Sequence, residues 1–179
     1  KKLASWIVNF EIIRRKKNKK LKVYSEEKGE IKLELKNGNM FTLSCKADRI
    51  EIMPDGIKIL DFKTGNIPSK KEIFSGISPQ LLLEALVMAE KGFNNISGLK
   101  KIKAPVTEIA YINLGTNMHF GNVISFKENL SHLITETQSN LKKLIEFYNN
   151  TTTPFLVSPN PNYKSSFNEY AHIERIEEL

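Results

Sequence analysis

Two acidic residues and a lysine, Asp48, Asp61 and Lys63, have the types and the spacing of a site that could hold a metal ion. Between the two acids lies a Met-Pro-Asp-Gly stretch, Met53–Gly56, which predicts a tight turn between two strands. Side chains alternate along a strand, so Asp61 and Lys63 share one face, and a hairpin would return Asp48 to their side. The three residues are therefore expected to meet at one point of a sheet.

This set of side chains suits magnesium-assisted cleavage of a phosphodiester bond. Mg²⁺ takes oxygen ligands and keeps several waters, so one or two carboxylates are enough to bind it. The ion polarises phosphoryl oxygens and lowers the pKa of a bound water. A lysine beside it can orient that water and offset the charge that builds on the phosphate. Because an acid-x-lysine sequence alone is also common in surface hairpins, the interpretation depends on further motifs.

Three segments together resemble the RecB-like branch of the PD-(D/E)XK nuclease superfamily: Ala47–Glu51 (ADRIE), Asp61–Gly65 (DFKTG) and Pro79–Leu81 (PQL). The nearest resemblance is to the C-terminal nuclease domain of alphaproteobacterial AddB-type proteins, which are subunits of the AddAB helicase–nuclease. It is strongest over residues 46–93 and returns at Asn168–Arg175, which is similar to the closing helix of those proteins. The resemblance implies an α/β fold with a central mixed β-sheet flanked by helices. It also implies a DNA exonuclease that acts in double-strand break repair and recombination.

The resemblance assigns roles to individual residues. Asp48 and Asp61 match the metal-binding acids, with the backbone carbonyl of Phe62 as a further ligand, and Lys63 matches the catalytic lysine. Gln80 matches the glutamine of the family's helical motif, and it is expected to orient Lys63 or to contact DNA.

The chain departs from the family pattern at Glu84, where many members have a tyrosine. Positions i and i+4 share a helix face, so Gln80 and Glu84 can both point toward the cleft, with a solvent-facing Glu84 as the alternative. Many members also have an upstream acid or histidine that completes the metal shell. Glu27 is a candidate for this ligand, as are Glu26 and Glu11, although ordinary surface charge is the simpler interpretation of each.

Length and composition fit one globular domain over residues 1–179, and the absence of an initiator methionine suggests a piece of a longer protein. No apolar run approaches the roughly 20 residues of a membrane span, and no signal-type leader is present, so a cytoplasmic location without a membrane partner is expected. The single cysteine, Cys45, cannot hold a four-cysteine iron–sulfur cluster. No iron–sulfur cluster is therefore expected, and the two acids and the resemblance imply Mg²⁺ or Mn²⁺ as the cofactor.

The formal net charge of +7, from 27 basic and 20 acidic residues, suits a polyanionic partner. The densest basic block, Arg14–Lys20, is either a phosphate-contacting patch or a solubilising helix end. The resemblance implies single-stranded DNA as the substrate and an AddA-like helicase–nuclease subunit as the partner that delivers it. The sequence contains no phosphate loop, so ATP-driven unwinding would have to come from another chain or region.

Hydrophobic periodicity predicts alternating helices and strands around these motifs. The first helix is expected to bury Trp6 and Phe10, and the helix that carries Gln80 is expected to begin with Ser78 as its N-cap and to end at Gly92. The expected strands cover residues 29–36, 40–52, 56–63, 108–114 and 122–126, and the expected helices cover 3–18, 70–74, 79–91, 128–149 and 167–178.

Two alternatives to this function stay open. A catalytically silent DNA-binding or scaffold module would keep the fold, and the missing upstream acid and the departure at Glu84 favour it. A standalone RecB-like or Cas4-like exonuclease is the other, and the shortage of cysteines counts against the Cas4-like form. The three histidines, His119, His132 and His172, lack metal-ligand spacing.

Overall fold

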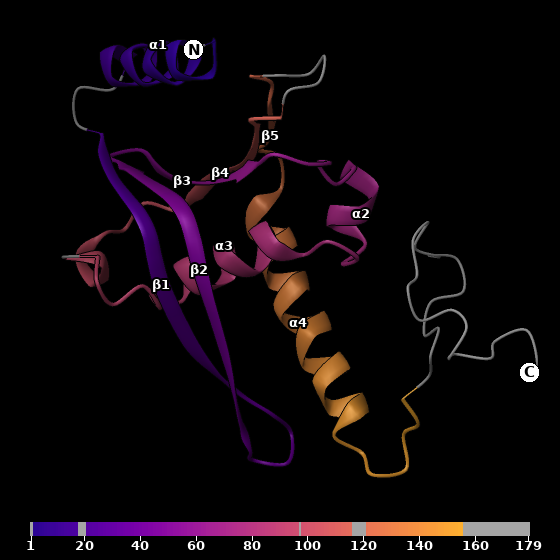
Figure 1. Ribbon diagram of the computed structural model, residues 1–179. Helices are drawn as coiled ribbons and strands as arrows, with labels where there is room; N and C mark the ends of the chain where they lie inside the picture. The colour runs from indigo at the N-terminus through magenta and orange to yellow at the C-terminus, as the bar shows by residue number, and fades with distance from the viewer. Residues whose placement is uncertain (1, 18–20, 97, 116–120, 156–179) are drawn as a thin grey trace, which may run out of the picture. The chain divides into compact units, whose positions relative to one another are not determined.

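Five strands form one mixed sheet in the order β1-β2-β3-β4-β5 (Figure 1). Neighbouring strands run antiparallel except for β3 and β4, which run parallel. Helices flank this sheet, so the expected fold class, a central mixed β-sheet with flanking helices, is confirmed. The strands are β1 (Lys22–Glu34), β2 (Met40–Met53), β3 (Gly56–Lys63), β4 (Val106–Asn113) and β5 (Val123–Phe126).

The computed structural model describes residues 2–17, 21–96, 98–115 and 121–155. Contacts within the chain divide it into two units, residues 1–142 and 143–179. The sheet belongs to the first unit. The expected helix over residues 167–178, together with His119 and His172, lies outside the described residues. No helix in the described part of the chain is long and apolar enough to span a bilayer.

Helices carry the chain from β3 to β4, since two parallel strands need a crossover between them. The crossover opens with α2, where Ser69 and Glu72 form a capping box: each side chain accepts a hydrogen bond from the other residue's backbone N–H. The helices are α1 (Lys2–Lys17), α2 (Lys70–Phe74), α3 (Gln80–Ala89), the 3₁₀ turn η1 (Leu99–Lys101) and α4 (Leu130–Tyr148).

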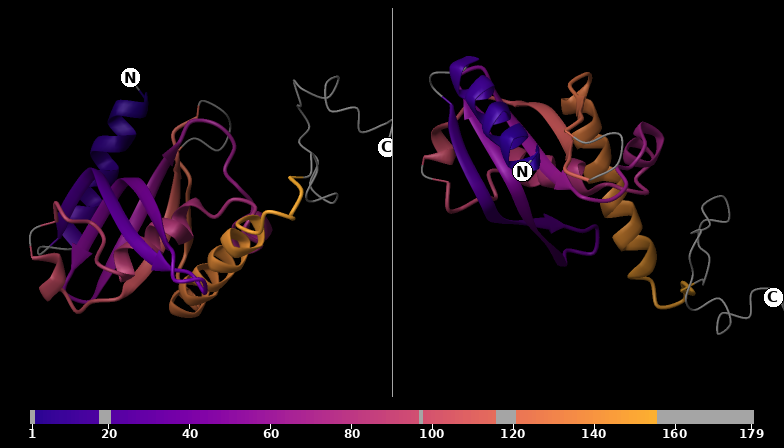
Figure 2. Two further views of the ribbon diagram at one scale, coloured as in Figure 1. Left: turned by 90° about the horizontal axis from the view of Figure 1, so that it is seen from below. Right: turned by 45° about the horizontal axis from the view of Figure 1, so that its top comes forward.

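The two faces of the sheet pack against different helices (Figure 2). The larger core lies on the face that α3 covers, and it includes Ile50, Ile59 and Leu86. A smaller core on the opposite face contains Leu60 and Ala110. Because side chains alternate along β3, residues 59, 61 and 63 share the face that α3 covers.

Helix α1 packs less deeply than the sequence predicted. Trp6 and Phe10 stack on each other with ring centroids 5.1 Å apart, and both are partly buried against the smaller core. None of the residues of α1 is fully buried, and Ile7 and Ile13 are 37% and 53% exposed. The apolar residues of α1 are spread around the helix, so the helix can bury only part of them against one small patch.

The expected start of α3 is wrong. The helix begins at Gln80 with Pro79 in the N-cap position and without a side-chain cap, so Ser78 does not cap it. The backbone N–H groups of Ile77 and Ser78 both donate to the carbonyl of Glu72. Ser78 therefore belongs to the turn that closes α2.

The end of α3 also differs from the prediction. The helix stops at Ala89, and Lys91, with φ of 59°, takes the left-handed position that was expected of Gly92. Lys91 and Gly92 donate to the carbonyls of Met88 and Val87, which is the Schellman pattern. Gly92 is needed for a different reason: a Cβ there would lie 2.5 Å from the carbonyl oxygen of Glu30 on β1.

The alternation of side chains along β2 breaks at Asp48. Ala47 and Ile50 are both completely buried in the larger core although they are three residues apart. The paired residues skip one position there, from Ser25↔Arg49 to Glu27↔Ala47, and Glu26 on β1 has a φ of 57°. This local irregularity puts Asp48 at the point where β2 changes its buried side.

The remaining elements agree with the prediction to within a few residues, except that β1 begins at Lys22 and is longer than expected. Leu130 and Ile134, at the start of α4, are buried in the larger core. In the second unit, Tyr148 stacks on Phe155 with ring centroids 5.0 Å apart.

Candidate active site

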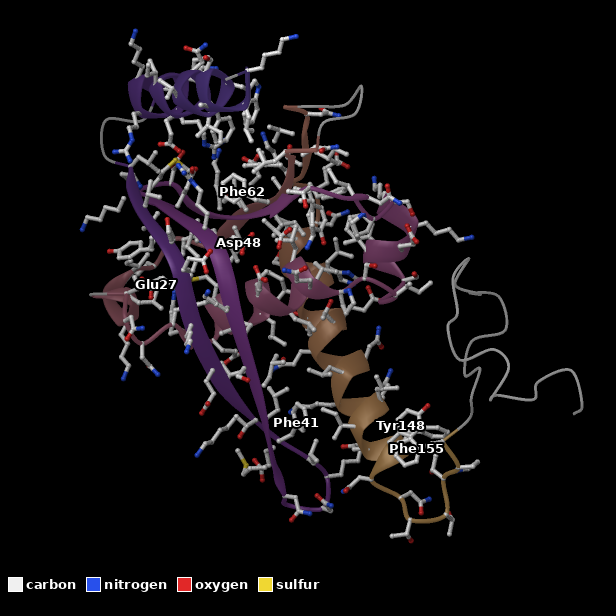
Figure 3. The ribbon with its side chains drawn as sticks, in the orientation of Figure 1. Glu27, Phe41, Asp48, Phe62, Tyr148 and Phe155 are labelled. Carbon is white, nitrogen blue, oxygen red and sulfur yellow. The ribbon has the colours of Figure 1, made fainter. Side chains whose placement is uncertain are left out.

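The β2–β3 hairpin brings the two predicted acids to the same place. Arg49 pairs with Leu60 in the last register position of this ladder, immediately before Asp48 and Asp61. Beyond this position the side chain of Asp48 continues the contact between the strands. Its Oδ2 accepts a hydrogen bond from the backbone N–H of Phe62 at 2.9 Å. Figure 3 shows Asp48 and Phe62 on these neighbouring strands. Phe62 thus contributes its N–H to the position of Asp48.

Lys63 lies against Asp61 on the same face of β3. Its Nζ is 2.9 Å from Asp61 Oδ2, and it also donates to Gln80 Oε1 at 2.9 Å. The ammonium group is 5.7 Å from the centre of the ring of Tyr111, which pairs with Asp61 on β4. A carboxylate, an amide oxygen and an aromatic face therefore hold the lysine head group in place.

The side-chain amide of Gln80 connects the cluster. Its Nε2 donates to Asp61 Oδ1 at 2.6 Å and to Glu84 Oε1 at 3.1 Å, while its Oε1 accepts from Lys63. Both hydrogens of the amide group are used on carboxylates, so the amide has one orientation that satisfies every partner. Gln80 and Glu84 lie one turn apart on α3, which places both side chains over the end of β3.

Burial makes the two carboxylates of this cluster unusually hard to ionise. Glu84 is only 2% exposed, and its burial raises its pKa to about 7, with a further contribution from the charges of Asp61 and Asp48. The pKa of Asp61 is also raised, mainly by burial, although Lys63 and Gln80 act in the opposite direction. Burial, with the same acids nearby, raises the pKa of Tyr111 to about 12.

Two buried oxygen atoms in the cluster have no hydrogen-bond partner: Asp61 Oδ2 and Glu84 Oε2. The contact of Asp61 Oδ2 with Lys63 is an ionic approach that lacks hydrogen-bond geometry. A buried carboxylate oxygen that accepts no hydrogen bond is costly, and hard cations such as Mg²⁺ prefer carboxylate oxygens as ligands. No group of three or more His, Cys, Asp or Glu residues in the described residues has the arrangement of a metal site. The carboxylate oxygens of Asp48 and Asp61 are hard donors of the kind that Mg²⁺ takes while it keeps several waters.

Two of the three candidate accessory acids, Glu26 and Glu27, lie on β1 beside Asp48, and the third, Glu11, lies on α1. Glu26 forms an ion pair with Lys46 at the surface. Glu27 pairs with Ala47, next to Asp48, and in the described part of the chain no hydrogen bond or ion pair joins it to the cluster (Figure 3). Glu11 pairs with Arg49 and Arg15 on the side of the sheet where α1 packs. These two arginines more than offset the effect of burial, so the pKa of Glu11 is lowered.

Sequence reasoning missed a second charged cluster directly behind the first. Glu51 is 1% exposed and accepts from Arg49 Nε at 2.8 Å and from Arg14 Nε at 2.9 Å. Arg49 Nη1 also pairs with Glu11, while its Nη2 is buried without a hydrogen-bond partner. The cluster attaches α1 to β2 one residue after Asp48. Its sequence signal was the alternation of Arg49 and Glu51 with the apolar Ile50 and Ile52 near the end of β2.

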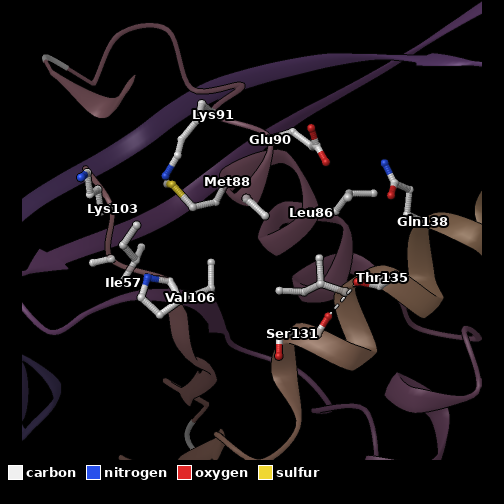
Figure 4. Close-up of a pocket in the computed structure, with 14 residues that line it drawn as sticks. Ile57, Leu86, Met88, Glu90, Lys91, Lys103, Val106, Ser131, Thr135 and Gln138 are labelled. Atoms are coloured by element: carbon white, nitrogen blue, oxygen red, sulfur yellow. Dashed lines mark hydrogen bonds between the residues drawn. The ribbon is translucent and has the colours of Figure 1, made fainter. Parts of the chain in front are cut away.

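The cavity shown in Figure 4 lies elsewhere, between the end of α3, the start of β4 and the start of α4. It has a volume of about 350 Å³, and Lys91 and Lys103 face Ser131 and Thr135 across it. None of the clustered acids, nor Lys63 or Gln80, lines it. The cavity is therefore separate from the candidate site.

A mixed sheet flanked by helices, with buried carboxylates and a lysine gathered at the end of β3, defines the class of α/β domain, and the comparison with known families names it. Residues 6–164 match the model of the PD-(D/E)XK nuclease superfamily, and the chain belongs to this superfamily. Its members are generally nucleases.

Similar curated proteins come from Rickettsia. An uncharacterized protein of Rickettsia conorii is 36% identical over 183 residues, which covers 93% of this chain and 21% of that protein. One from Rickettsia typhi is 49% identical over 86 residues, covering 48% of this chain and 10% of that protein. The chain thus spans about a fifth or less of these relatives. Among solved structures, that of SSO0001 is similar with a TM-score of 0.39 and 10% identity, over 83% of this chain and 59% of that one.

Proposed function

We propose that this chain is a Mg²⁺- or Mn²⁺-dependent deoxyribonuclease domain of the RecB-like branch, and that it cleaves single-stranded DNA as an exonuclease. The observation that carries the proposal is the bridge made by Gln80, which joins Lys63, Asp61 and Glu84 beside two buried carboxylate oxygens that accept no hydrogen bond. Such a cluster costs stability unless a cation or a substrate uses it.

The roles of the residues follow from their contacts. Asp48 and Asp61, with the Phe62 carbonyl, would hold the metal ion, which would supply polarisation of the phosphoryl oxygens and a water of lowered pKa. Lys63 is held at the rim of the site, where its charge would stabilise the negative charge that develops on the phosphoryl oxygens. Gln80 would keep Lys63 in place.

The wider assignment rests on the resemblance of the motifs. By that resemblance, the domain would work in the cytoplasm in double-strand break repair and recombination, within an AddAB-like helicase–nuclease, and an AddA-like subunit would deliver the strand. The low coverage of the relatives, 21% of the Rickettsia conorii protein, is compatible with a nuclease domain inside a much longer chain.

The test is a cleavage assay with labelled linear single-stranded, linear double-stranded and circular single-stranded DNA. We expect the linear single strand to be degraded in Mg²⁺ or Mn²⁺, the circle to resist, and chelator to stop the reaction. Cleavage of the circle would overturn the exonuclease assignment but keep the nuclease. Binding of DNA without cleavage in either metal would favour the alternative, a catalytically silent DNA-binding or scaffold module.

A further inference from the structure

A hollow of about 310 Å³ lies between α2 and β5, outside the cluster of acids. Phe74 and Phe126 meet there edge to face, with ring centroids 5.4 Å apart, and both rings are only partly buried. Its volume is at the low end of the range of clefts that bind small organic groups. Its lining consists of Lys70, Phe74, Ser125, Phe126, Lys127 and Glu128.

The hollow opens on the same face of the sheet as the candidate site. Asp61 pairs with Tyr111, and Tyr111 pairs with Ile124 on β5, so these three side chains share one face. Phe126 is two residues beyond Ile124 and points to that face as well. Two strand spacings and two residues separate Asp61 from Phe126, which is on the order of 12 Å. A chain of a few nucleotides could reach from one to the other.

The charges around the hollow favour an anionic ligand. Lys70 and Lys127 are both exposed, and the Lys70 ammonium group lies 5.6 Å from the centre of the Phe74 ring. Lys127 has one weak ion-pair contact, 3.7 Å from Glu108, and Glu108 is also paired with Lys58 at 2.8 Å. Glu128 is the acidic residue in the lining. An exposed lysine changes rotamer within nanoseconds, so Lys70 can leave the ring for a phosphate and uncover it.

From this arrangement we infer that the hollow is a stacking subsite for single-stranded DNA. A base of the strand stacks on the ring of Phe74 or Phe126, and Lys70 and Lys127 contact the phosphates on either side of it. Aromatic stacking together with nearby cations is the common way to bind single strands without reading their sequence. The inference rests on the proposed function, because it names the route by which the strand enters the cluster of Asp61 and Lys63.

The test measures binding in chelator, so that no cleavage occurs, with a short fluorescent oligothymidylate and with an abasic oligomer of the same length. The variants Phe74→Leu and Phe126→Leu keep an apolar side chain and remove the ring. We expect each to weaken oligothymidylate binding about tenfold and to leave abasic binding unchanged. Phe41→Leu is the matched control, since Phe41 is a half-buried ring near the tip of the β1–β2 hairpin (Figure 3).

The lysines are tested by the salt dependence of binding. Lys70→Gln and Lys127→Gln should each reduce the slope of log affinity against log salt by about one phosphate contact, whereas Lys32→Gln on β1 should not. If both leucine variants bind oligothymidylate as the parent does, or lose abasic binding equally, the stacking subsite is wrong. That result can occur while the parent still cleaves DNA, so failure of the subsite is distinguishable from failure of the proposed function.

Discussion

Gln80 donates a hydrogen bond of 2.6 Å from its Nε2 to Asp61 Oδ1, so the first residue of α3 and the end of β3 are locked together. The same amide accepts from Lys63 through its oxygen. The position of the lysine therefore depends on a residue of the crossover helix. The strand that carries Lys63 does not fix that position alone.

The variant Gln80→Ala should lower the rate of DNA cleavage by on the order of tenfold to a hundredfold while DNA binding in chelator stays near the parent value. The reason is that Lys63 loses a partner at 2.9 Å, and small displacements of a positioned group are expensive in rate. Single-turnover rates give the comparison. Gln138→Ala, which changes the same residue type in the separate cavity, should cleave like the parent. A Gln80→Ala enzyme with the parent rate would mean that the bridge has no part in catalysis.

Glu84 should make the free energy of unfolding depend on pH in metal-free protein. Its pKa is about 7 in the folded protein against an ordinary value of 4.5, so the folded state holds the extra proton between these values. The parent should therefore lose stability as the pH rises from about 4.5 to about 7, by on the order of 2 to 3 kcal/mol.

Glu84→Gln removes this titration. In chelator it should be more stable than the parent at about pH 8 and nearly equal to it at about pH 4.5, as measured by urea unfolding. Glu136→Gln, at an exposed position of α4, should show little difference from the parent at either pH. An equal effect of Glu84→Gln at both pH values would show that Glu84 is not held in its neutral form by burial.

The buried Glu51 should be essential for stability and not for chemistry. Glu51→Ala leaves Arg49 buried without its main partner, so the free energy of unfolding should fall by about 3 to 5 kcal/mol. Denaturant titration measures this loss. The control is Arg15→Ala, which removes an exposed i,i+4 pair with Glu11 and should cost less than about 1 kcal/mol. Comparable losses in the two variants would rule out the attachment of α1 through Glu51.

Gly92 should not tolerate a methyl group. The added Cβ of Gly92→Ala would lie 2.5 Å from the Glu30 carbonyl oxygen, so α3 and β1 would have to separate, at a cost of about 1 to 3 kcal/mol. Gly65→Ala is the matched control, because nothing lies within 4 Å of a Cβ there. Thermal melts of the two variants test the difference. A Gly92→Ala protein as stable as the control would show that the close approach of α3 and β1 is not needed.

Local sequence signals predicted the hairpin well. The Pro-Asp-Gly turn fixes β2 against β3, and the period of two then puts Asp61 and Lys63 on one face. The i,i+4 spacing likewise brought Gln80 and Glu84 together on α3. These features depend on residues that are near one another in the chain, where turn chemistry and periodicity are reliable.

The features that the sequence did not predict depend on long-range contacts. From the sequence alone, Glu84 could equally be an acid on the exposed face of the helix. It is buried because α3 packs on the sheet. The hydrogen bond from Arg14 to Glu51 joins residues 37 positions apart, and no local sequence pattern predicts it. The sequence Ser78-Pro79 is typical of a helix start. In the structure the Ser78 N–H donates to the carbonyl of Glu72, so the helix begins later than the local sequence predicts.

The central claim is that Lys63, held by Asp61 and Gln80, stabilises the negative charge that develops on the scissile phosphate. The most direct measurement is the single-turnover rate at which Lys63→Ala cleaves labelled linear single-stranded DNA in Mg²⁺, with DNA binding measured in parallel in chelator. We predict a loss in rate of on the order of a hundredfold or more with binding nearly unchanged, because the lysine acts on charge that develops only during the reaction. Lys32→Ala, an exposed lysine on β1, should keep the parent rate. A Lys63→Ala protein that cleaves at the parent rate would contradict the account.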